Sequence, residues 1–94
     1  MDKEEILLFL KENKPFLQQR FHVEKIGLFG SFSTETATRE SDVDILVSMP
    51  SSFDDYYALK EFLESNLKRN VDLGMEKTLR HMIKKEIQNE IIYV

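Results

Sequence analysis

The chain of 94 residues contains no cysteine, which excludes disulfide bridges, thiolate nucleophiles and cysteine-based zinc sites. It has no tryptophan, two prolines and three glycines, so few residues interrupt regular structure. The longest unbroken apolar run, 6–10, is far shorter than the roughly 20 residues that a membrane-spanning helix needs. The first residues are acidic where a secretory signal would be basic. We therefore expect a cytoplasmic protein with no membrane segment.

Positive charge is also scarce, because 17 acidic residues face 13 basic ones and give a net charge of −4. A protein that binds nucleic acid by neutralising phosphates needs a basic surface, so direct nucleic-acid binding is not expected. The acidic excess lies in residues 35–64, which carry eight acids and two bases. The length predicts a single domain, 1–94, with one hydrophobic core.

Apolar periodicity predicts alternating helices and strands. Long helices are expected over 2–20 and from Ser51 or Ser52 to about residue 68. A short helix is expected from Ser31 or Phe32, and a last helix is expected to be capped by Thr78. Strands are expected over 24–29, 42–48 and 70–75. Residues 91–94 are either a terminal strand or a tail on the core. This order predicts a small α/β (α+β) fold, a short sheet with helices packed on it.

One predicted helix contains a proline, and another has two cations at its end. Pro15 either kinks the first helix or opens a second short one, since proline does not fit a helix interior. Lys68 and Arg69 are expected in the last turn of the long middle helix, where cations favour the helix dipole.

Asp42 and Asp44 interrupt an otherwise apolar strand. Residues i and i+2 of a strand share a face, so both carboxylates should project from one side, while Val43 points into the core. Like charges this close repel and raise each other's pKa unless a cation neutralises them. Carboxylate oxygens without nearby histidine or cysteine favour Mg²⁺ or Mn²⁺. An isolated Asp-x-Asp is otherwise a helix cap or a surface turn.

Gly30-Ser31 follows one predicted strand and opens a short helix, and ten residues separate Ser31 from Asp42. Glycine lets a ligand approach the backbone, and the serine hydroxyl can donate to a phosphate. Asp72 is the one charge between two apolar residues of the third strand, and it joins Asp42 and Asp44 if that strand lies beside the second. Carboxylates next to a phosphate cradle predict a nucleotide site suited to metal-assisted phosphoryl transfer.

The chain resembles the minimal (MNT) branch of the nucleotidyltransferase superfamily, whose catalytic fold is like that of DNA polymerase β. The resemblance lies in the stretches 26–32 and 40–47 and in the closing Val71-Asp72-Leu73. The resemblance implies a minimal nucleotidyltransferase domain over 1–94 with a mixed sheet. It implies ATP as substrate, phosphates held at Gly30 and Ser31, and Mg²⁺ or Mn²⁺ held by catalytic Asp42, Asp44 and Asp72. It also implies transfer of AMP to a hydroxyl on a HEPN-domain partner, as the antitoxin of a toxin–antitoxin pair, with oligomers possible.

The sequence departs from that family at one place. Ser33-Thr34-Glu35 stand where the family commonly has Ala-Arg-Gly, so the usual triphosphate-binding cation is missing; Arg39 could supply one from later in the loop. An alternative within the family is a binding module that neutralises its HEPN partner by occlusion. An alternative outside it is a small α/β metal-binding or signalling domain with an acid pocket.

The remaining polar and aromatic residues favour structural roles. His22 and His81 lack the spacing of metal ligands, and they are expected at a helix end and on a basic helix face. Arg80, Lys84 and Lys85 form a basic patch that is either solvated or contacts a triphosphate or an acidic partner. Four aromatics at helical spacing are expected in the core or at an interface rather than stacked on a base: Phe53, Tyr56, Tyr57 and Phe62.

Overall fold

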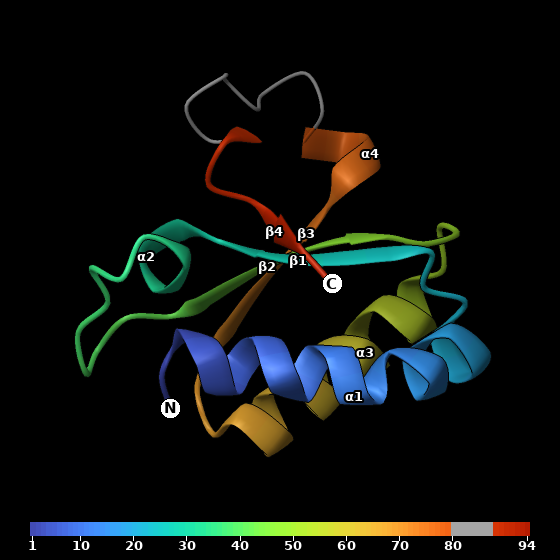
Figure 1. Cartoon of the computed structure of the whole chain (residues 1–94). Helices are drawn as coiled ribbons and strands as arrows, with labels where there is room; N and C mark the ends of the chain where they lie inside the picture. The colour runs from blue at the N-terminus through green and yellow to red at the C-terminus, as the bar shows by residue number, and fades with distance from the viewer. Residues whose placement is uncertain (80–87) are drawn as a thin grey trace.

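A computed structural model describes residues 1–79 and 88–94 and gives a four-stranded mixed sheet with helices on it (Figure 1). The elements are α1 (Lys3–Phe21), β1 (Lys25–Phe29), α2 (Gly30–Ser33), β2 (Val43–Ser48), α3 (Phe53–Leu67), β3 (Val71–Met75), α4 (Glu76–Leu79) and β4 (Ile92–Tyr93). The strand order is β3-β2-β1-β4. β1 is antiparallel to β2 and β4, whereas β2 and β3 are parallel. The predicted small α/β (α+β) fold is confirmed.

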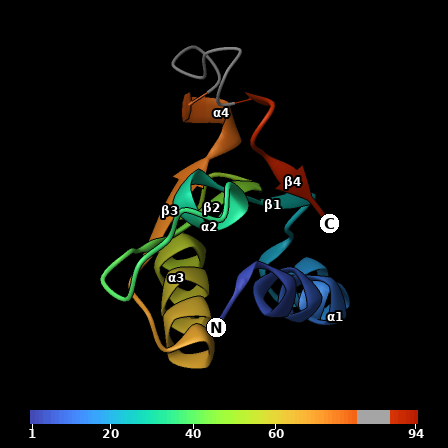
Figure 2. The same cartoon turned by 60° about the vertical axis from the view of Figure 1, so that its left-hand side comes forward.

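The two long helices lie side by side on one face of the sheet, and α4 stands on the opposite face (Figures 1 and 2). Alternation along β2 creates the core beneath the long helices, because Val43, Ile45 and Val47 are each fully buried. The helices complete this core with their own buried stripes: Ile6, Leu10, Leu17 and Phe21 of α1, and Leu59, Leu63 and Leu67 of α3. Burying one such side chain contributes about 1.5–3 kcal/mol, so these stripes fix the sheet on the helices.

α1 is a single helix that includes Pro15, so the alternative of a second short helix was wrong. Its start is fixed by a capping box, in which the Asp2 side chain accepts from the Glu5 amide at 2.9 Å and the Glu5 side chain accepts from the Asp2 amide at 3.2 Å. It ends at His22, which is exposed and has a left-handed backbone, as a helix-end residue was expected to be. No helix in the described part of the chain is long and apolar enough to cross a bilayer.

The ends of the later helices decide one prediction and correct two. Of the two serines expected to cap α3, Ser52 does so, and its hydroxyl accepts from the Asp55 amide at 3.3 Å. α3 ends at Leu67, so Lys68 is its left-handed cap and Arg69 lies beyond it, rather than both in its last turn. α4 begins at Glu76, directly after β3, so Thr78 lies inside that helix and does not cap it.

Other sequence predictions have mixed outcomes at the C-terminus. The end of the chain forms a strand, β4, and is not merely a tail. His81 and the basic patch of Arg80, Lys84 and Lys85 lie outside the described residues, as does the part of the predicted last helix beyond residue 79.

The four aromatics of α3 divide into two pairs. Phe62 packs against Phe16 of α1 with 5.2 Å between ring centroids, and the Tyr56 hydroxyl donates to the Leu73 carbonyl at 2.5 Å. Both are therefore partly buried structural residues, as expected. Phe53 and Tyr57 are 77% and 51% exposed and pack against each other, so a core role for them was wrong.

Candidate active site

Asp44 and Asp72 lie directly opposite each other on neighbouring parallel strands. The residue before each acid, Val43 or Val71, is buried on the side of the sheet that faces the helices. Because side chains alternate along a strand, both carboxylates project from the other face. Adjacent strands are about 4.8 Å apart, which brings the two acids into direct interaction. The expectation that the third strand lies beside the second, so that Asp72 joins Asp44, is met by the strand pairing.

The ionisation of Asp44 reflects this arrangement. Its pKa is raised from 3.8 to about 6, first by burial and then by the negative charges of Asp72 and Asp42 and a hydrogen bond with Asp72. Asp44 and Asp72 therefore carry negative charge that their surroundings do not neutralise. A bound proton or cation would reduce the repulsion between the two carboxylates. Burial and like charge raise the pKa of active-site carboxyls in the same way in many enzymes.

Gly30 lies against the Asp44 carboxyl because the register pairs Phe29 with Asp44 at the end of β1. A Cβ on Gly30 would overlap that carboxyl, at 2.9 Å from its Cγ, and Gly30 has a φ of +74°. Both the close approach and the left-handed backbone require glycine here. The next residue, Ser31, is half-buried at the start of α2. The structure thus places Gly30 beside Asp44, with Ser31 next in the chain.

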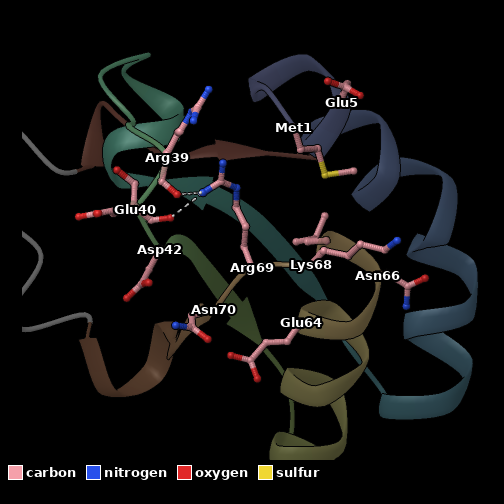
Figure 3. A pocket seen from close by; sticks show the side chains of 12 residues that line it. Met1, Glu5, Arg39, Glu40, Asp42, Glu64, Asn66, Lys68, Arg69 and Asn70 are labelled. Carbon is pink, nitrogen blue, oxygen red and sulfur yellow. Dashed lines mark hydrogen bonds between the residues drawn. The ribbon is translucent and has the colours of Figure 1, made fainter.

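Asp42 occupies a different environment from the other two acids. It is exposed and precedes β2, and it borders an open cleft of about 1020 Å³ that is also lined by Glu64, Arg69 and Asn70 (Figure 3). Its charge still raises the pKa of Asp44, so it belongs to the same electrostatic cluster. Within residues 1–79 and 88–94, no three carboxylate or imidazole side chains converge closely enough to form a ready metal site.

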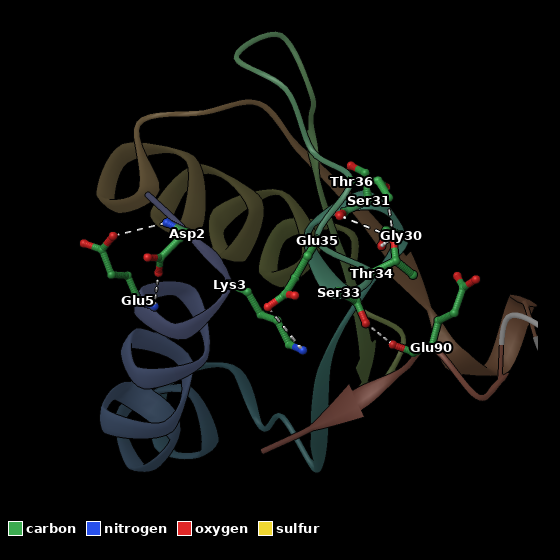
Figure 4. Close-up of polar contacts among 10 residues, drawn as sticks. All are labelled: Asp2, Lys3, Glu5, Gly30, Ser31, Ser33, Thr34, Glu35, Thr36 and Glu90. Carbon is green, nitrogen blue, oxygen red and sulfur yellow. Dashed lines mark hydrogen bonds and ion pairs between the residues drawn. The ribbon is translucent and has the colours of Figure 1, made fainter.

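The loop that departs from the family pattern is held by hydroxyl groups and one ion pair (Figure 4). The Ser33 hydroxyl donates to the Glu90 carbonyl, and the Thr34 hydroxyl lies 3.0 Å from that of Thr36. Glu35 has a φ of 62° and pairs with Lys3 of α1 at 4.0 Å. Glu35 therefore adopts a left-handed backbone, a conformation that glycine adopts most readily.

Arg69 is a residue that the sequence prediction misplaced. It lies between α3 and β3, and its Nη1 donates to the carbonyls of Arg39 and Ser41, at 2.9 and 3.2 Å. Arg39, the residue expected to supply the missing cation, is exposed and borders the same cleft. A cationic side chain two residues before the strand that carries Asp72 was visible in the sequence, but it did not indicate these bonds to residues 39 and 41.

Comparison with known proteins decides the family. Residues 10–94 match the nucleotidyltransferase domain model. The chain belongs to the nucleotidyltransferase domain family. The protein adenylyltransferase MntA of Thermococcus cleftensis is 41% identical over 93 residues, which cover 97% of this chain and 94% of MntA. A provisionally named protein adenylyltransferase of Methanocaldococcus jannaschii, MJ1379, is 38% identical over 95 residues, covering 96% of this chain and 95% of the relative.

Solved structures confirm the fold of this nucleotidyltransferase. A provisionally assigned minimal nucleotidyltransferase superposes with a TM-score of 0.80 at 26% identity, covering 98% of this chain and 95% of that one. A chain from a toxin–antitoxin crystal structure with AMP-PNP gives a TM-score of 0.57 at 30% identity, covering 82% of this chain and 59% of that one. The predicted resemblance to minimal nucleotidyltransferases is confirmed, and the alternative of a domain from outside the family was wrong.

Proposed function

We propose that this protein transfers AMP from ATP to a hydroxyl group of a HEPN-domain partner and thereby acts as the antitoxin of a toxin–antitoxin pair. Two comparisons support the proposal: the relative MntA is named a protein adenylyltransferase, and one similar chain comes from a toxin–antitoxin structure with AMP-PNP. The observation in this chain that carries it is the contact between Gly30 and Asp44, with Asp72 beside Asp44.

The donor chemistry of the acids suits a hard divalent cation, and Asp44 and Asp72 lie opposite each other on neighbouring strands. Carboxylate oxygens are the donors that Mg²⁺ and Mn²⁺ prefer, and the raised pKa of Asp44 reflects negative charge that such an ion would neutralise. Asp44 and Asp72 would hold the ion, with Asp42 contributing from its exposed position. When bound, the ion supplies a positive charge that stabilises the charge developing on the phosphates. The phosphates would lie at Gly30 and Ser31, the backbone next to Asp44.

The proposed reaction transfers AMP from ATP to a hydroxyl group, and Asp72 acts on the proton of that hydroxyl. The acceptor hydroxyl oxygen forms a bond to the α-phosphorus of ATP, and the bond from that phosphorus to the oxygen bridging to the β-phosphate breaks. Pyrophosphate leaves with the electron pair of the broken bond. Asp72 takes the hydroxyl proton as general base, and its exposed position on β3, at the edge of the described sheet, leaves it accessible to a partner side chain.

A second candidate function is neutralisation of the partner by occlusion alone. It is favoured by Thr34 and Glu35, which place a hydroxyl and an acid where the family commonly has a triphosphate-binding arginine and a glycine. The Glu35 carboxylate pairs with Lys3, which reduces the charge that Lys3 could offer to a phosphate.

A cellular assay separates the two functions. A candidate HEPN-domain partner would be expressed with wild-type protein, with Asp72→Asn, or with Asp42→Asn/Asp44→Asn, and growth would be measured. We expect only the wild type to protect, because transfer needs the acids. Equal protection by all three proteins would instead establish occlusion. Copurification of each variant with the partner is the control that both are folded and present.

A further inference from the structure

Arg69 connects three segments of the chain, and Figure 3 shows its hydrogen bonds to the loop before Asp42. It lies in the turn between α3 and β3, three residues before Asp72. Its guanidinium donates to the carbonyls of Arg39 and Ser41, in the loop that leads into β2. It also lies over the ring of Phe32 in α2, 5.1 Å from the ring centroid, and Phe32 is buried. One partly buried side chain therefore contacts both the segment before Asp42 and the helix that begins at Gly30.

Asp42 needs such support because it lies outside the ladder of β2. The chain from residue 38 to residue 41 is closed on itself, since the Thr38 amide donates to the Ser41 hydroxyl at 2.8 Å and the Ser41 amide to the Thr38 carbonyl at 3.2 Å. These bonds shape the turn but do not attach it to the body of the protein. Arg69 makes that attachment, through the Ser41 carbonyl.

The other side of Asp42 is held by the residue that follows Arg69. The Val43 amide donates to the Asn70 carbonyl at 2.9 Å. The backbone is thus fixed immediately before Asp42 by Arg69 and immediately after it by Asn70. Since consecutive Cα atoms are about 3.8 Å apart, fixing both neighbours leaves Asp42 little freedom relative to β3 and Asp72.

We propose that Arg69 is a positioning residue that fixes the backbone carrying Asp42 next to the metal site proposed at Asp44 and Asp72, and this inference rests on the proposed function. Arginine suits the role because a charged donor makes strong hydrogen bonds to carbonyls and a planar guanidinium packs on an aromatic ring. Lysine could donate to one of the carbonyls but would lose the planar contact with Phe32.

The test compares Arg69→Met and Arg69→Lys with wild type, and Lys68→Met is the matched control one residue away. Lys68 is exposed, and its side chain makes no hydrogen bond or ion pair among the described residues. Mn²⁺ binding would be titrated by electron paramagnetic resonance without nucleotide, and hydrogen exchange would be measured at the Val43 amide. Losing support of a metal ligand typically weakens metal affinity by about 10–100-fold.

For Arg69→Met we expect Mn²⁺ affinity to fall by about tenfold or more, together with faster exchange at Val43. Arg69→Lys should lie between that variant and wild type, and it provides the test if Arg69→Met does not fold. Lys68→Met should match the wild type in both measurements. Unchanged Mn²⁺ affinity and exchange in the Arg69 variants would overturn the positioning role alone. Wild-type protein that binds no Mn²⁺ would overturn the proposed function and this role together.

Discussion

Replacing Asp44 with asparagine should stabilise the metal-free protein above neutral pH, although it removes a proposed catalytic residue. The pKa of Asp44 is raised in the folded state, so the folded protein binds this proton more tightly than the unfolded chain does. Ionisation of Asp44 therefore costs folding free energy as the pH rises from about 4 through about 6, and the cost is constant above that range. Asparagine does not ionise and avoids this cost.

The size of this stabilisation follows from the pKa of Asp44, which rises from 3.8 to about 6 in the folded protein. At 1.36 kcal/mol for each pKa unit, the shift has a ceiling of about 3 kcal/mol. Asp44 is partly exposed, so solvent screening reduces the expected gain to about 1 kcal/mol. In a domain of this size, such a gain raises Tm by about 4–8 °C.

The assay is urea unfolding of wild type and Asp44→Asn at about pH 4 and about pH 7.5, in chelator, with linear extrapolation to water. We expect the variant to gain about 1 kcal/mol on the wild type between the two pH values. Glu24→Gln, an exposed acid between α1 and β1, should show no such gain and controls for general charge effects. A difference between Asp44→Asn and wild type that does not change with pH would refute the reasoning.

Three further predictions concern the surroundings of the site. Glu35→Gly should raise the free energy of unfolding by about 0.5 kcal/mol, because relief of the left-handed backbone outweighs the added freedom of the unfolded chain; a loss of stability on urea unfolding would contradict this. Gly30→Ala should destabilise the fold by more than about 1 kcal/mol, and by less in an Asp44→Ala background, where the left-handed backbone still disfavours alanine; a double-mutant cycle with no coupling would argue against their contact. Tyr56→Phe should lower the free energy of unfolding by about 1 kcal/mol, because the hydrogen bond to the Leu73 carbonyl is lost. Tyr57→Phe, at an exposed neighbour, should have little effect, and equal losses of Tm in the two variants would exclude that explanation.

The strands and their acids could be predicted from the sequence because alternation decides them directly. Val43 and Val71 are apolar neighbours of Asp44 and Asp72, so burying the valines forces both acids to the opposite face. The pairing of Asp44 with Asp72 also required the third strand to lie beside the second, which a short α/β order favours. For these residues, local pattern and tertiary structure agree.

Other parts of the site depend on contacts that no local pattern encodes. Arg69 follows α3, and a cation there equally suits the helix dipole, so its bonds to residues 39 and 41 could not be foreseen. Glu35 adopts a left-handed backbone that its residue type disfavours, and the surrounding turn imposes it. Likewise, Thr78 is a typical cap residue, but α4 starts at Glu76 because β3 runs directly into it.

Intact mass spectrometry of the HEPN partner tests the central claim most directly, namely that Asp44 and Asp72 form the catalytic site of an AMP transferase. The partner would be incubated with ATP, Mg²⁺ and either the wild type, Asp72→Asn or the control Glu24→Gln. The account predicts a mass increase of one or more adenylates with the wild type and with Glu24→Gln, and none with Asp72→Asn. An unmodified partner in a stable complex with the wild type, or full modification by Asp72→Asn, would contradict it.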